Sequence, residues 1–246
     1  MEKIYTAIYW ATAALAGYVF ALLIAWYGVS GLNFFYSTFY EYVGVGENIV
    51  EYGPLNRNRS GFENTTKLEH ERLMSELVRA INNNGEGLRE IQYFDNEGRA
   101  LDSLLTEPEV IHLQDVAKLV SRFNVAGWLA AALLVAMIVI ALRLRLSVPG
   151  LAKLVVYTIG SIVVLGLGVL IIGPVKVFYW LHEWIFPAKN QWFFYYEDSL
   201  MTTMLKAPVI FGPIAVAWLL IATVLWLVVF YSILRISSKL GDNRRY

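Results

Sequence analysis

The chain has 246 residues, of which 57% are hydrophobic and only 16% are charged. This composition and a mean hydropathy of +0.51 are typical of an integral membrane protein and exclude an ordinary soluble domain. The 20 basic and 20 acidic residues leave no net charge, and the chain contains no cysteine, which excludes disulfides and cysteine catalysis.

Four apolar stretches are long enough to cross the hydrocarbon core of a bilayer, which is about 30 Å thick and requires roughly 20 helical residues. In chain order they are Ala7 to Gly28, Val125 to Leu142, Leu154 to Val175 and Pro208 to Ile233. The first run is longer than the apolar part of a signal peptide and no small-residue cleavage site follows it, so it is predicted to be a retained span. The sequence therefore predicts an all-α membrane protein with four transmembrane helices.

The positions of Lys and Arg in the short segments predict the orientation of the chain. Eight basic and two acidic residues lie in the amino-terminal end, the turn between the second and third spans, and the carboxyl-terminal tail. The loop from Ser30 to Asn124 instead carries nine basic and fifteen acidic residues. We therefore expect both termini in the cytoplasm and the long loop on the outer side of the membrane.

The long loop is predicted to form a small, mainly helical extracytoplasmic cap. A helix capped by one of residues 64–66 is expected to reach Ile81, because apolar residues recur there at helical spacing. Gln92 to Ala100 is typical of a short hairpin. Thr106 to Glu109 forms a capping box with proline in the first turn, so a helix is expected to begin here and to continue into the second span.

The predicted organisation has three parts. Residues 1–29 form the cytoplasmic amino-terminus and the first span, residues 30–124 form the cap, and residues 125–246 form the other three spans and a basic cytoplasmic tail. Within the last part, residues 176–207 are unusually rich in Trp, Tyr and Phe, which concentrate at the boundary between water and lipid. This segment is predicted to lie along the outer interface.

Two of the three histidines are the best candidates for chemistry near neutral pH, because imidazole titrates in this range. His112 has Glu109 and Asp115 at i−3 and i+3 on neighbouring parts of one helix face, although a solvated surface histidine is an equal alternative. His182 lies in the aromatic segment, where the alternative is an anchoring residue of the interfacial belt. His70 lies in a run of charges, so it is predicted to occupy a solvated helix face without a functional role.

Short segments after the first span, before the second and after the third carry a resemblance to a known family. They are Phe34-Phe35-Tyr36 with Tyr40, Glu109 to Val116, His182 with Trp184 to Pro187, and Trp192 to Phe194, together with Asp198-Ser199-Leu200 before the last span. In these segments the chain resembles the Lit-type lipoprotein intramolecular transacylases. The resemblance implies a bacterial cytoplasmic-membrane protein with four spans, both ends inside and a site at the outer face.

The same resemblance implies an acyl transfer within a diacylated lipoprotein substrate. The sn-2 acyl chain of the diacylglyceryl group on the N-terminal cysteine would move to the α-amine of that cysteine, giving a lyso-form lipoprotein. An amine attacking an ester needs no enzyme nucleophile, which agrees with the absence of cysteine and of a G-x-S-x-G motif. The amine does need a base, because it titrates near pH 7.7 to 8.0.

We expect His112, oriented by Asp115 or Glu109, to act as the base, and His182 to donate a hydrogen bond to the oxyanion or a proton to the leaving oxygen; the two roles are exchangeable. The residues expected to contact substrate or the membrane interface are Tyr36, Trp184, Phe186 and Trp192.

Two alternatives remain open from the sequence. The first is a non-catalytic membrane subunit or chaperone whose acidic cap binds a protein partner. The second is a metal site of His112 and His182 with Glu109, Asp115 or Glu183, for which the chain lacks the local spacing of a zinc motif. We therefore expect no metal and no cofactor. The external loop has no Lys/Arg patch, so nucleic acid is not an expected partner. Membrane lipid is an expected partner, and the sequence does not predict an oligomeric state.

Overall fold

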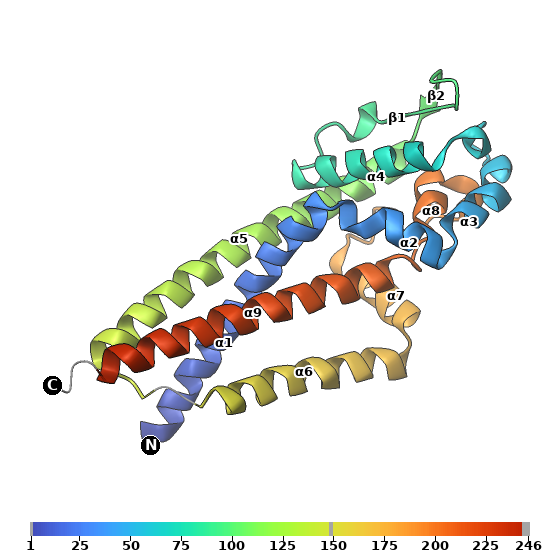
Figure 1. Ribbon diagram of the computed structural model, residues 1–246. Helices are drawn as coiled ribbons and strands as arrows, with labels where there is room; N and C mark the ends of the chain where they lie inside the picture. Colours follow the sequence, from blue (N-terminus) through green and yellow to red (C-terminus); the bar gives the residue numbers. More distant parts are fainter. Residues whose placement is uncertain (1, 148–149, 243–246) are drawn as a thin grey trace. The chain divides into compact units, whose positions relative to one another are not determined.

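The computed structural model describes residues 2–147 and 150–242, and most of these residues are helical (Figure 1). Among these described residues, four helices are long and apolar enough to cross a membrane: α1 (Glu2–Gly31), α5 (Glu107–Leu144), α6 (Leu151–Ile172) and α9 (Phe211–Asp242). Each contains most of one predicted span, although α6 ends at Ile172 rather than Val175 and α9 begins at Phe211 rather than Pro208. The predicted class, an all-α membrane protein with four spans, is confirmed. Of the predicted basic tail, Arg244 and Arg245 lie outside the described residues.

The described chain divides into two compact units. One, which we call the span unit, contains the described parts of Met1–Gly28, Phe123–Ile172 and Ala217–Tyr246. The other, which we call the head unit, contains Val29–Arg122 and Gly173–Val216. Every residue discussed below as part of the candidate site lies in the head unit.

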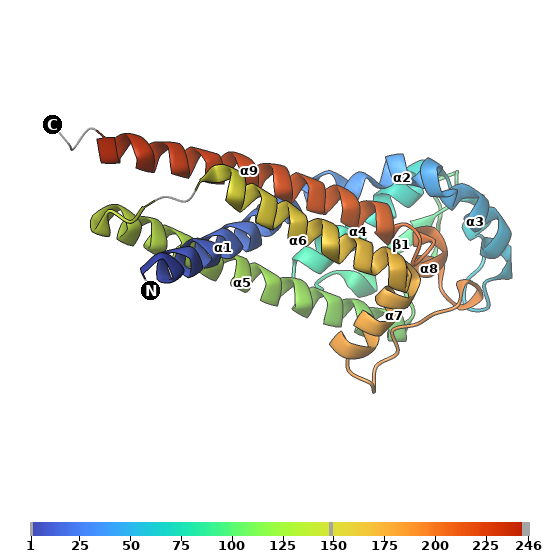
Figure 2. The same cartoon turned by 90° about the horizontal axis from the view of Figure 1, so that it is seen from below.

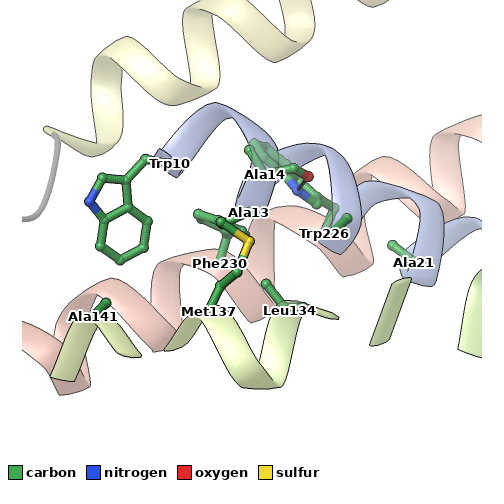
Figure 3. Close-up of a cluster of buried hydrophobic side chains, with 10 residues drawn as sticks. Trp10, Ala13, Ala14, Ala21, Leu134, Met137, Ala141, Trp226 and Phe230 are labelled. Atoms are coloured by element: carbon green, nitrogen blue, oxygen red, sulfur yellow. Dashed lines mark hydrogen bonds between the residues drawn. The ribbon is translucent and has the colours of Figure 1, made fainter. Parts of the chain in front are cut away.

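Aromatic side chains and small residues form the core of the span unit (Figure 3). Trp226 and Phe230 of α9 are each 1% exposed, and their rings stack with centroids 5.3 Å apart. The indole of Trp226 donates a hydrogen bond to the carbonyl of Ala14 in α1 at 3.0 Å. Alanines in α1 allow this approach, because a methyl side chain leaves room for a ring between two helices.

Short helices and one hairpin build the head unit. Tyr93 and Phe62 are fully buried at its centre, with ring centroids 5.3 Å apart. The elements are η1 (Asn33–Phe35), α2 (Tyr36–Val43), α3 (Val45–Tyr52), η2 (Gly53–Leu55), η3 (Phe62–Asn64), α4 (Lys67–Asn82), η4 (Leu88–Glu90), β1 (Gln92–Phe94), β2 (Ala100–Ser103), the first turns of α5, α7 (Pro174–Ile185), η5 (Tyr196–Asp198) and α8 (Leu200–Leu205).

Local signals in the sequence account for the helix α4 and for the two strands β1 and β2. Thr66 caps α4 by accepting a hydrogen bond from the backbone N–H of Glu69 at 3.2 Å. The predicted hairpin exists as the antiparallel pair β1 and β2, with Tyr93 opposite Asp102, and its second strand extends to Ser103. Both the helix and the hairpin were predicted within a few residues.

The capping box at the start of α5 is present in one direction. The Glu109 carboxylate accepts hydrogen bonds from the backbone N–H and the hydroxyl of Thr106, both at 2.6 Å. At 1.5 Å per residue, the 38 residues of α5 are about 57 Å long, roughly twice the thickness of the hydrocarbon core. The apolar stretch Val125 to Leu142 suffices to cross it, and the polar turns before Arg122 belong to the head unit.

Gly173 separates α6 from α7. Its φ of 103° is open to glycine and costly for other residues, and Pro174 then occupies the first turn of α7. The break ends the apolar helix α6, and a new helix, α7, which carries His182, begins directly after it (Figure 2).

The expectation that His70 lies on a solvated face is wrong. Its side chain is 3% exposed, because position 70 shares the buried face of α4 with Leu73, Met74 and Leu77 at helical spacing. The Tyr40 hydroxyl lies 3.0 Å from Nδ1 of His70, and the Thr65 hydroxyl lies 2.6 Å from Nε2. Hydrogen bonds on both ring nitrogens offset the free-energy cost of burying this imidazole.

Candidate active site

His112 and His182 lie side by side although seventy residues separate them in the chain. His112 is in the second turn of α5 and His182 near the end of α7, and their ring centroids are 6.1 Å apart with the rings inclined by 37°. At this separation both rings can lie within hydrogen-bond distance of one small group placed beside them.

The environment of His112 is apolar. Its side chain is 8% exposed, and the rings of Phe186 and Phe194 lie 4.9 and 6.1 Å from the imidazole. The alternative of a solvated surface histidine is therefore excluded. Burial lowers the pKa of His112 to about 4; the neighbouring His182 also lowers it, and Asp115 opposes both effects. His112 is consequently neutral at pH 7.

A backbone carbonyl fixes the orientation of His182. Its Nδ1 lies 2.8 Å from the carbonyl oxygen of Phe178, one helical turn earlier. A carbonyl oxygen only accepts, so Nδ1 carries the proton of the neutral ring, and Nε2 is the nitrogen that holds the lone pair. Burial lowers the pKa of His182, and the bond to Phe178 opposes this effect in part. This histidine too is neutral at pH 7.

Aromatic rings surround the pair. The Phe178 ring lies 3.9 Å from that of His182, and the rings of Phe186 and Trp192 lie 5.1 and 5.3 Å from it. Phe178 comes from α7, and Phe186 and Trp192 come from the segment between α7 and η5. Such walls offer apolar surface to a lipid chain and exclude water from the imidazoles.

The two carboxylates that flank His112 in the sequence hydrogen-bond elsewhere. Glu109 accepts a hydrogen bond from the hydroxyl of Ser199 in addition to those from Thr106. Asp115 accepts from the Lys118 ammonium at 2.9 Å and from the Asn190 amide at 2.5 Å. Across residues 2–147 and 150–242, neither carboxylate hydrogen-bonds to an imidazole.

The two carboxylates differ in their electrostatics. Burial raises the pKa of Glu109, and the hydrogen bonds from Ser199 and Thr106 only partly counter it. Burial also acts to raise the pKa of Asp115, but the hydrogen bonds from Lys118 and Asn190 outweigh it, so the pKa is lowered. Asp115 is therefore the more firmly ionised of the two.

The remaining predicted site residues are Phe186, Trp192, Tyr36 and Trp184. Phe186 and Trp192 line the histidine pair, as described above. Tyr36 is fully buried in the head unit, and its hydroxyl donates to the carbonyl of Met204 at 2.9 Å. The Trp184 side chain is 77% exposed and stacks parallel to Trp180, with ring centroids 6.4 Å apart.

Four residues of the site were not singled out from the sequence: Phe178, Asn190, Phe194 and Ser199. The helical spacing i−4 from His182 would have indicated Phe178. Phe194 and Ser199 lay in recognised segments without an assigned role, and Asn190 gave no signal because its partner lies 75 positions away. As for the metal alternative, the described part of the chain holds no group of three His, Asp or Glu side chains suited to a metal ion.

Comparisons with known proteins give one family and one solved structure. A family model described as lipoprotein intramolecular transacylase Lit matches residues 15–208. The chain is also similar to the in meso structure of the membrane integral lipoprotein intramolecular transacylase Lit from Bacillus cereus, determined with a histidine-to-arginine mutation. The TM-score is 0.63 at 18% identity, over 100% of this chain and 94% of that chain, which indicates a shared fold. No curated protein matches the chain in sequence.

Proposed function

The chain belongs to the lipoprotein intramolecular transacylase Lit family, and from this premise we propose that it moves the sn-2 acyl chain of a diacylglyceryl-cysteine lipoprotein onto the α-amine of the same cysteine. It is a multi-pass bacterial membrane acyltransferase that acts on lipoproteins. The proposed product is the lyso-form lipoprotein. The observation that carries the proposal is the pair of neutral imidazoles, His112 and His182, within an aromatic enclosure.

The tautomer of His182 favours this residue as the general base. Its Nε2 holds a lone pair, and its Nδ1–H is already engaged by the carbonyl of Phe178. As the amine nitrogen attacks the ester carbon, the amine proton passes to Nε2 of His182. Of the two exchangeable assignments expected from the sequence, this one agrees better with the hydrogen bond at Nδ1.

His112 is then proposed to serve the oxygens of the ester. A neutral imidazole donates a hydrogen bond through one nitrogen, and in the tetrahedral intermediate this bond stabilises the oxyanion or the departing glyceryl oxygen. When the bond between the acyl carbon and the glyceryl oxygen breaks, that oxygen takes up a proton. The proton that His182 accepted from the amine balances it, so no net proton is gained or lost. The second imidazole is thus a hydrogen-bond donor with no net charge of its own.

The intramolecular character of the reaction explains why so few groups are needed. Donor ester and acceptor amine are parts of one lipid-modified residue, so binding in the correct geometry replaces a bimolecular encounter. In favourable systems such positioning contributes roughly 7 to 11 kcal/mol to the lowering of the barrier. Phe186 and Trp192 are proposed to hold the acyl chain against the imidazoles, and exposed Trp184 to contact membrane lipid.

The location of the reaction is part of the same proposal. The distribution of Lys and Arg supports cytoplasmic termini and a site at the outer face of the membrane. The residues expected to form the outer cap, 30–124, and the aromatic segment, 176–207, contribute both histidines. A non-catalytic subunit would need no such pair of juxtaposed neutral imidazoles, which favours the enzyme over that alternative.

Replacement of each histidine tests the proposal. His112→Gln and His182→Gln are expected to abolish acyl migration on a diacylated model lipoprotein while the protein stays folded. Fragmentation mass spectrometry of the N-terminal peptide measures the product, because transfer leaves the total mass unchanged and moves one acyl chain to the amine.

His70→Gln is the matched control, since it makes the same substitution at a buried histidine outside the site. It is expected to retain activity at pH 7, because glutamine can both accept from Tyr40 and donate to Thr65. Near-normal activity in either site variant would refute its assigned role. Absence of acyl migration with folded wild-type protein and sound substrate would refute the proposed reaction.

A further inference from the structure

Two hydrogen bonds fasten residues 190–199 to α5, one on each side of His112. Asp115, three residues after His112, accepts from the Asn190 side chain at 2.5 Å. Glu109, three residues before His112, accepts from the Ser199 hydroxyl. Three residues are slightly less than one helical turn. The two bonds therefore hold the segment about one turn before and one turn after His112 along α5. We call residues 190–199 the strap.

The strap carries aromatic walls of the site between its two attachment points. Trp192 lies 5.3 Å from the ring of His182, and Phe194 lies 6.1 Å from that of His112. The strap also has contacts outside α5: the rings of Trp192 and Phe193 each lie 5.9 Å from that of Tyr179 in α7, and the Asp198 carboxylate accepts from Arg57 at 2.9 Å. Of these contacts, the two bonds to α5 are the ones that join the strap to the helix carrying His112, on either side of that residue, so they help to set where Trp192 and Phe194 lie.

Both attachment points are sheltered and involve acidic side chains. Glu109 and Ser199 are each fully buried, and the Asp115 side chain is 12% exposed. Hydrogen bonds to an ionised acceptor are roughly twice as strong as those between neutral groups. All four carboxylate oxygens already accept a bond, from Thr106 and Ser199 at Glu109 and from Lys118 and Asn190 at Asp115.

From this arrangement we infer that Glu109 and Asp115 are positioning residues that act on the reaction by holding the strap across His112, and that Asn190 and Ser199 are their counterparts in the same role. This inference rests on the proposed function of the two histidines. It differs from the expectation that the carboxylates orient an imidazole directly. A displaced strap would move the walls that hold the acyl chain, and a misplacement of about 1 Å can cost 100-fold in rate.

A double-mutant cycle at Asp115 and Asn190 tests the inference. Asp115→Ala and Asn190→Ala are each expected to lower the rate at saturating substrate by about 10- to 100-fold. The double variant is expected to be no slower than the slower single variant, because both substitutions remove the same bond. Additive losses, or full activity of Asn190→Ala, would overturn the inference.

Conservative variants separate a positioning role from a need for negative charge. Asp115→Asn keeps a carbonyl oxygen that can accept from Asn190, so its rate should stay within a few-fold of wild type. Asn190→Asp opposes two carboxylates and should be slow, whereas Asp115→Asn combined with Asn190→Asp restores one donor and one acceptor and should recover the rate. If Asp115→Asn is as slow as Asp115→Ala, charge rather than position is needed and the inference fails.

Lys118→Gln is the matched control, because it removes the other partner of Asp115 and leaves the strap bond in place. The Lys118 side chain is 65% exposed, and the variant should act within about twofold of wild type. Hydrogen exchange in the full-length protein without substrate reads the strap independently of turnover. Faster exchange of the strap amides in Asn190→Ala supports the fastening even if the proposed reaction fails, and unchanged exchange overturns it.

Discussion

Each of the three histidines of the chain lies in the head unit and is at least partly buried, and burial disfavours the imidazolium form. At His112 and His182 this leaves two neutral rings for acid–base chemistry. At His70 the same effect serves structure, because both ring nitrogens are engaged by Tyr40 and Thr65. Identical chemistry at the residue level therefore gives two different roles, decided by what occupies the ring nitrogens.

The buried state of His70 predicts a loss of stability in acid. Burial lowers its pKa from 6.5 to about 4, outweighing the attraction of Glu69 and Glu71. Between pH 4 and pH 6.5 the His70 side chain binds a proton in the unfolded chain and not in the folded chain. The stability that the neutral imidazole contributes is therefore complete above pH 6.5 and is lost as the pH falls toward 4. The free energy of unfolding should drop by up to about 3 kcal/mol from this group.

The measurement compares the apparent Tm of wild type and His70→Gln in detergent at pH 7.5 and 4.5. The variant lacks the titrating group, so the acid-induced fall in its Tm should be the smaller of the two. Other groups titrate equally in both proteins and cancel in the difference. An equal fall in both proteins would show that His70 is not held neutral in the fold.

At the scale of elements, local sequence signals predict where the helices and the hairpin lie. They predict little of the backbone conformation in the turns between these elements. Thr66 and the capping box at Glu109 are local signals, and α4 and α5 begin where these signals predict. Asn33, Phe34 and Phe35 instead adopt φ values of 53°, 52° and 55° in succession. Non-glycine residues seldom take this left-handed conformation, so the residue types at these positions do not predict it.

Contact between helices in the span unit gives a prediction at the same scale. A methyl group at Gly127 in α5 would lie 2.6 Å from a side-chain carbon of Leu23 in α1. Overpacking typically costs about 1 to 3 kcal/mol. Gly127→Ala should therefore lower the apparent Tm by about 2 to 8 °C despite the better helix propensity of alanine.

Gly160 in α6 provides the comparison, because nothing lies within 4 Å of a methyl group added there. Gly160→Ala should leave the Tm unchanged or raise it slightly. Equal behaviour of the two variants in a detergent melting experiment would show that α1 and α5 do not approach each other at Gly127.

At the scale of the whole molecule, hydropathy predicted the class and the four spans because a bilayer imposes its thickness on each helix separately. The candidate site could be predicted only as a set of residues. Its pairing of His112 with His182, and of Asp115 with Asn190, joins segments about seventy positions apart, and spacing within one helix carries no information about such contacts. The direct role expected for Glu109 and Asp115 arose from their shared helix face, whereas their hydrogen bonds go to the strap.

The orientation of the chain remains a prediction, and the absence of cysteine makes it directly testable. Glu97, in the exposed turn between β1 and β2, is expected on the outer side, and Lys153, at the start of α6, on the cytoplasmic side. In intact cells a membrane-impermeant maleimide should therefore label Glu97→Cys and not Lys153→Cys, which should react only after permeabilisation. The reverse pattern would place the histidine pair on the cytoplasmic face, where the proposed lipoprotein substrate would have to be presented from inside the cell.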